Sequence, residues 1–116
     1  MKQIITIFLA ILFSPIVSAG HPDCSGEKRW ATVSAFVHLK NAGITNNDSL
    51  DFDKTITTRL ASEKAGEDLY IQIHHVIFTE KSGKIIEVIT ENEASNEECS
   101  MSGVRVFVVN QVLGGK

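Results

Sequence analysis

Histidines are the first residues of this sequence that could do chemistry, because imidazole binds metals and exchanges protons near neutral pH. His74 and His75 are adjacent, and successive side chains of a strand point to opposite faces of a sheet. His38 lies far from both in the sequence, so the close spacing of a metal-ligand set is missing. A zinc or copper site is a minor alternative, and we expect neither a metal nor a cofactor.

Catalytic motifs are missing as well. The sequence contains no Gly-x-Ser-x-Gly motif and no glycine loop of the kind that binds phosphate. Four glutamates fall within residues 91–98, and such an acidic run is usually a solvated loop. The two cysteines lose their reactivity as nucleophiles if they are oxidised. We therefore predict a protein that is not an enzyme.

The first 19 residues have the layout of a secretory signal peptide. Lys2 supplies a positive charge, residues 4–17 are almost wholly apolar, and Ala19 ends a run of small residues suited to cleavage. The apolar run is shorter than the ~20 residues that span a bilayer as a helix. We predict cleavage after Ala19, with Gly20 as the alternative, no stable membrane insertion afterwards, and a periplasmic or secreted location.

Cys24 and Cys99 are the two cysteines of the chain. In an exported protein two thiols most simply form one disulfide. No Cys-x-x-Cys pair suggests a redox role, and further metal ligands at close spacing are missing. We predict a structural disulfide between Cys24 and Cys99 that joins the mature N-terminus to a late loop.

Length and charge exclude several classes of protein. The chain has 116 residues, a formal net charge of -3 and 22% charged residues. About 150 residues per domain is a fair prior, so residues 20–116 form a single small domain. A multidomain enzyme, a transmembrane bundle and a basic nucleic-acid binder are all excluded, and we expect no nucleic-acid partner.

Residues 26–42 fit two patterns. Trp30, Val33 and Phe36 lie on a broad helical face, Ser25 could cap the start, and Gly43 stands where a left-handed helix terminator is expected. Residues 31–39 also alternate as a strand would. About 15 residues without a turn motif suit a helix better, so we predict a helix here.

Four strand-like runs follow, at residues 54–62, 69–80, 84–90 and 104–113. Glycine-containing pairs lie between them, as expected between antiparallel neighbours. The predicted fold is α+β: one N-terminal helix packed on a four-stranded antiparallel β-meander, pinned by one disulfide.

The register of the central hairpin predicts which side chains share a face. If Ser82-Gly83 forms a two-residue turn, Ile77 lies opposite Val88 and His74 opposite Glu91; a bulged turn would shift this register by one residue. The predicted core face contains Leu69, Ile71, Ile73, Ile77, Ile86 and Val88. The other face contains Tyr70, Gln72, His74, Val76, Phe78, Glu87, Ile89 and Glu91.

That second face is half apolar, and one short helix cannot cover both sides of a sheet. Exposed apolar patches with polar rims mark interaction sites. The candidate protein-binding residues are Tyr70, Gln72, His74, Val76, Phe78, Ile89 and Arg59. We expect a binding module, such as an inhibitor or an immunity protein, whose partner is another exported protein or a second copy. The alternative is a carrier of a small ligand or metal that uses His74 or His75.

Overall fold

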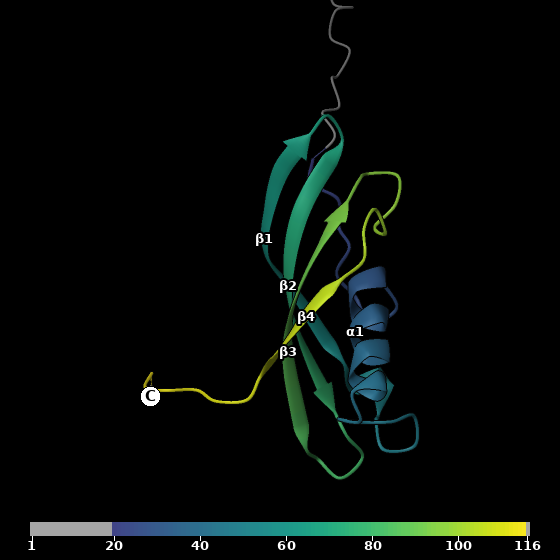
Figure 1. Ribbon diagram of the computed structural model, residues 1–116, viewed down its shortest axis with the longest axis vertical. Coiled ribbons are helices and arrows are strands. Elements are labelled where there is room, and N and C mark those ends of the chain that lie inside the picture. The colour runs from purple at the N-terminus through teal and green to yellow at the C-terminus, as the bar shows by residue number, and fades with distance from the viewer. Residues whose placement is uncertain (1–19, 116) are drawn as a thin grey trace, which may run out of the picture.

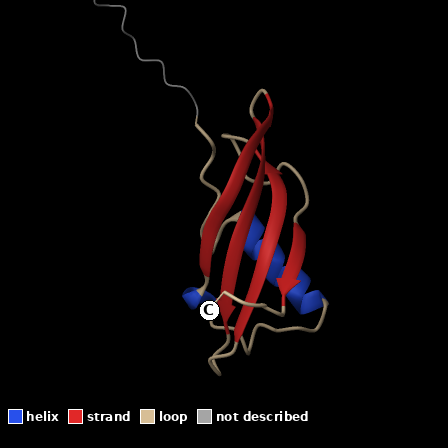
Figure 2. Ribbon diagram, turned by 90° about the vertical axis from the view of Figure 1, so that its left-hand side faces the viewer, coloured by secondary structure: helices blue, strands red, loops and turns tan. Residues whose placement is uncertain are grey.

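One helix and one sheet make up the part of the chain that the computed structural model describes, residues 20–115. The predicted signal peptide lies outside this range. Helix α1 (Trp30–Asn41) precedes a short 3-10 turn, η2 (Phe52–Lys54). The strands are β1 (Ile56–Gly66), β2 (Leu69–Thr79), β3 (Ile85–Ala94) and β4 (Arg105–Val109). They form one antiparallel sheet in chain order, with α1 packed on one face (Figures 1 and 2), which confirms the predicted fold.

Helix α1 ends where the sequence predicts but begins later. Ser25 does not cap it, because the Ser25 amide and hydroxyl both donate to the Asp23 carboxylate instead, at 3.2 and 2.7 Å. The first helical residue is Trp30, preceded by Arg29. At the other end Gly43 takes a left-handed φ of +75°, and the two amides that follow Ala42 bond back into the last turn. This is the glycine-terminated helix end that the sequence indicates.

The turn between β2 and β3 differs from the prediction. It is a three-residue loop, residues 81–83, in which the Glu80 amide donates to the Lys84 carbonyl at 2.8 Å. Gly83 occupies the left-handed position of this loop with a φ of +97°. Three-residue hairpin loops of this kind have glycine at their last position. The predicted two-residue turn ends at the same glycine, so the glycine alone does not distinguish the two turns. The predicted two-residue turn is therefore wrong by one residue.

A shift of one residue in the pairing of β2 with β3 exchanges the two faces of β2, because side chains alternate along a strand. Ile77 lies opposite Glu87 instead of Val88, and His74 opposite Thr90 instead of Glu91. The prediction for β3 is correct, because Ile86 and Val88 are buried beneath α1. On β2 the side chains that face α1 are instead Tyr70, Gln72, His74, Val76 and Phe78. The residues predicted for the core, which are partly exposed on the opposite face, are Leu69, Ile71, Ile73 and Ile77.

The space between α1 and the sheet has an apolar half and a polar half. The apolar half is built from Ala35, Leu39, Leu50, Val76, Phe78, Ile86 and Val88. Phe78 is fully buried there, with the ring centroids of Phe36 and Phe52 at 6.3 and 6.4 Å from its own. The polar half lies further along β2 and β3, towards the disulfide. This division matters because apolar burial stabilises the first half and hydrogen bonds must satisfy the second.

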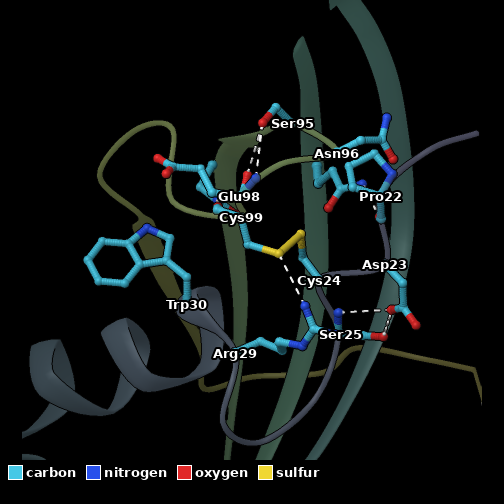
Figure 3. The surroundings of a disulfide bond; sticks show 12 residues. Pro22, Asp23, Cys24, Ser25, Arg29, Trp30, Ser95, Asn96, Glu98 and Cys99 are labelled. Carbon is cyan, nitrogen blue, oxygen red and sulfur yellow. Dashed lines mark hydrogen bonds between the residues drawn. A yellow bond between two sulfur atoms is a disulfide. The ribbon is translucent and has the colours of Figure 1, made fainter. Parts of the chain in front are cut away.

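The predicted disulfide is confirmed. Cys24 and Cys99 are bonded, with their Cα atoms 5.7 Å apart, and the bond ties the N-terminal segment (residues 20–25) to the loop between β3 and β4 (Figure 3). Around it Arg29 contacts the Cys99 sulfur at 3.5 Å, and the Trp30 indole donates to the Ser102 carbonyl at 2.9 Å. Within residues 20–115, no helix is both long and apolar enough to cross a membrane.

Candidate functional site

The sheet face turned away from α1 is the main candidate surface, and Figure 2 looks directly onto it. We call it the open sheet face. Its apolar members, given by the strand register and the alternating burial, are Ile56, Ala61, Leu69, Ile71, Ile73, Ile77, Ile85, Ile89, Phe107 and Val109. Ile56 is 58% exposed and Phe107 40% exposed, while the isoleucines of β2 are partly buried. All four strands therefore contribute apolar side chains to this face.

Charged side chains divide this apolar surface. The charged or titratable members of the open sheet face are Glu63, His75, Glu87, Glu91, Glu93 and Arg105. His75 contacts Glu87, and Arg105 donates to Glu91 at 2.8 Å while its guanidinium lies 5.0 Å from the Phe107 ring centre. Arg105 is the one fixed cation on this face within the described strands. Four glutamates against one arginine make the face acidic as well as apolar.

A shallow hollow lies at the disulfide end of the open sheet face. Its volume is about 320 Å³, and its lining includes Ile71, Glu91, Glu93 and Arg105. Because Arg105 already pairs with Glu91, the carboxylate left for a basic side chain of a partner is that of Glu93, and the methylene groups of such a side chain can lie on Ile71.

Comparison with known proteins gives no relative for this chain. It matches no protein-family model, no curated protein and no solved structure. Its activity must therefore be argued from its own residues and surfaces.

The candidate binding residues predicted from the sequence lie in different parts of the structure. Those on β2 (Tyr70, Gln72, His74, Val76 and Phe78) are at most 4% exposed and face α1 or the N-terminal segment, so they present no surface to a partner. Ile89 lies on the open sheet face. Arg59 is exposed and donates to the Pro22 carbonyl at 3.0 Å, which gives it a role in holding the N-terminal segment.

The surface residues that the sequence reasoning missed are Ile71, Ile73 and Ile77, which it assigned to the core. The glutamates of β3 could not indicate them, because the prediction already placed Glu87 and Glu91 on the outer side and only the register with β2 was wrong. Glu87, Glu91 and Glu93 alternate with buried residues and mark the outer side of β3, and in the true register the odd-numbered residues of β2 share that side.

A buried polar block fills the other side of the same strands. Gln72 pairs with Asn92 and His74 with Thr90 across β2 and β3, and all four side chains are at most 4% exposed. The Gln72 amide donates to the Pro22 carbonyl at 2.9 Å, and the Asn92 amide donates to the Cys99 carbonyl at 2.9 Å. The polar block thus holds the two segments that the disulfide joins.

His74 is the titratable member of this block. Both of its ring nitrogens are buried and lack a hydrogen-bond partner in the described structure. Burial lowers the pKa of His74 below its ordinary value of 6.5, the positive charge of Arg59 lowers it further, and Asp23 opposes these two effects. Within residues 20–115, no group of three His, Cys, Asp or Glu side chains is placed to hold a metal ion.

The fold should lose stability as the pH falls below 6.5, the ordinary pKa of histidine. Below this pH His74 is protonated in the unfolded chain but stays neutral in the folded chain. The free energy of unfolding therefore falls with pH until the pH reaches the lowered pKa of His74 in the folded state. Urea unfolding at neutral and mildly acidic pH measures this slope. His74→Gln should flatten it, and His38→Gln, which removes an exposed helical histidine, is the matched control. Equal slopes in the wild type and His74→Gln would contradict the prediction.

Proposed function

We propose that this chain is a small exported protein, periplasmic or secreted, that binds another protein through the open sheet face and has no enzymatic activity of its own. A disulfide is consistent with an oxidising compartment, and the predicted signal peptide supports export. Binding of this kind would suit an inhibitor or an immunity protein, which acts by covering a surface of its partner.

The observation that carries this proposal is the group of apolar side chains that all four strands contribute to the open sheet face. Large apolar patches rimmed by polar groups mark protein interaction sites on soluble proteins. Regular strands also hold such a surface in one conformation, which lowers the entropy lost on binding. Ile73 stands at its centre on β2, between Ala61 of β1 and Glu91 of β3.

The charges of the face favour a basic partner over a second copy at this surface. Face-to-face association of two copies would bring eight glutamates together with only two arginines. Like charges brought together in an interface cost several kcal/mol, on the order of the whole affinity of a weak complex. A partner with an apolar centre and basic rim residues would instead complement the isoleucines and the free carboxylates, with one basic side chain in the hollow beside Ile71.

Ile73→Lys should weaken binding about 30-fold or more, because it adds a cation and removes apolar surface at the centre of the face. Loss of a hot-spot residue near the centre of an interface costs about 2 kcal/mol or more, which is about 30-fold in affinity. The wild type and the variant are immobilised and exposed to the exported fraction of the source cells, and the retained protein is then purified and titrated against each by calorimetry. Val33→Lys, on the outer side of α1 and 37% exposed, is the matched control.

Three outcomes decide the result. A partner that binds the wild type and Val33→Lys but binds Ile73→Lys much more weakly supports the proposal. A partner that binds Ile73→Lys with unchanged affinity refutes the use of this face. A partner lost equally in both variants would place the binding surface elsewhere.

A further inference from the structure

The two edges of the sheet are built differently. On the β1 edge the register shifts twice, between Arg59 and Ala61 and between Lys64 and Gly66. The N-terminal segment also lies against this edge, with the Arg59 guanidinium and the Ser62 hydroxyl bonded to Pro22 and His21. Bulges, charges and a covering segment are the features that keep a foreign strand from adding to a sheet edge.

The β4 edge has no register shift among the described residues, and its single charge stands at one end. Its pairing with β3 runs from Arg105 to Val109 without a register shift, and Arg105 is its one charged residue. The other four residues are Val106, Phe107, Val108 and Val109, of which Phe107 and Val108 are 40% and 41% exposed. A flat apolar edge with free backbone groups is a template for a further strand.

An apolar groove runs beside this edge, between β4 and the end of α1. It consists of two adjoining hollows of about 390 and 510 Å³ that share Ile44 and Val108 in their lining. Leu39 and Val106 contribute to the first hollow, and Ile86 to the second. The groove exists because β4 is the last strand, so that no neighbour fills the space between its helix-facing valines and α1.

We propose that the β4 edge pairs with β4 of a second copy of this chain, giving a dimer with one continuous antiparallel sheet. An isologous two-fold contact requires a surface that complements itself. Antiparallel pairing centred on Phe107 places Val106 beside Val108 of the second copy and the two Phe107 rings across from each other. Arg105 then meets Val109 of the second copy, so the one charge of each strand does not face its equivalent.

This pairing also fills the groove. The side chains of Val106 and Val108 of the second copy point to the same side of the sheet as α1, and they would stand next to Ile44 and Leu39. Both helices lie on one side of the joined sheet, and both open sheet faces lie on the other. The proposal is therefore independent of the function proposed for the open sheet face, and it covers only the Phe107 and Val109 margin of that face.

The test compares two valines of equal exposure. Val108 on β4 and Val37 on the outer side of α1 are both 41% exposed. The protein purified from the exported fraction, and the variants Val108→Lys and Val37→Lys, are examined by sedimentation velocity over a wide range of concentrations from micromolar upwards. The wild type and Val37→Lys should sediment as dimers, and Val108→Lys should raise the dimer dissociation constant about tenfold or more, because lysine is a residue that natural sheet edges use to block pairing.

Hydrogen exchange of the wild type keeps the proposal testable even if Val108→Lys fails to fold. Backbone amides within Arg105–Val109 should become more protected as the protein concentration rises, since a new strand bonds to that edge. A wild type that stays monomeric at all concentrations overturns the proposal. So does a dimer that Val108→Lys leaves intact, or one whose formation protects no amide of β4.

Discussion

The double variant Cys24→Ala/Cys99→Ala is expected to lose about 4.5 kcal/mol of its free energy of unfolding, because the disulfide removes that much loop entropy from the unfolded chain. The two cysteines are 75 residues apart in the sequence, so the bond closes most of the mature domain into one loop. Small domains have about 5–15 kcal/mol of net stability in total. The variant should therefore be partly or wholly unfolded at physiological temperature.

Removal of the disulfide should also lower the free energy of unfolding through local contacts, in addition to its effect on loop entropy. Cys24 is buried and holds the N-terminal segment in place, so that the Pro22 carbonyl can accept hydrogen bonds from Gln72 and Arg59. When the bond is missing and the segment is released, the Gln72 amide loses the Pro22 carbonyl and keeps only the Ser62 hydroxyl, at 3.0 Å, so one of its two N–H donors lacks a protein partner. A buried donor without a partner costs about 1–3 kcal/mol.

Urea titrations of the variant and of the wild type, with and without a reducing agent, measure this loss. The reduced wild type should resemble the double variant, which separates loss of the bond from any effect of the alanines. Ser25→Ala, which changes a neighbouring exposed loop contact only, is the matched control. A loss below about 1 kcal/mol, under the range typical of native disulfides, would contradict the prediction.

The architecture could be predicted because each of its features has a local cause in the sequence. Gly43 ends the helix with a left-handed backbone, and the helix cannot continue past it. Glycines at the turns separate the strands, and the two cysteines of the chain have only each other as disulfide partners. None of these inferences depends on a long-range register, which is why they survive comparison with the structure.

The assignment of the sheet faces depends on one residue, and the sequence of the turn does not decide it. Ser82-Gly83 can end a two-residue turn or a three-residue loop, and the glycine occupies a left-handed position in both. Hydrophobicity did not help, since β2 is apolar on both sides: Ile71, Ile73 and Ile77 look more like a core than Gln72 and His74 do. The glutamates of β3 mark the outer side of that strand in either register, so they do not decide which side of β2 shares it.

The polar block could not be predicted because its partners come from elsewhere in the chain. Gln72 and Asn92 are buried where the Pro22 and Cys99 carbonyls approach them, on segments about 50 and 7 residues away in the sequence. Strand periodicity says nothing about such contacts. A buried glutamine or histidine is recognisable only when the segment that covers it is known.

Phe78→Ala should cost about 3–5 kcal/mol of unfolding free energy, the range for removing a fully buried aromatic side chain. Phe78 is 0% exposed and lies among Phe36 and Phe52, so its removal leaves a cavity that rigid neighbours cannot fill. Ile77→Ala is the matched variant, because Ile77 is its neighbour on β2 but lies on the open sheet face; we expect less than half of that loss. Urea unfolding of both variants tests the register directly. In the two-residue-turn register Ile77 would be the core residue and Phe78 the exposed one, so a larger loss for Ile77→Ala would reverse the two faces and remove the isoleucines from the binding surface.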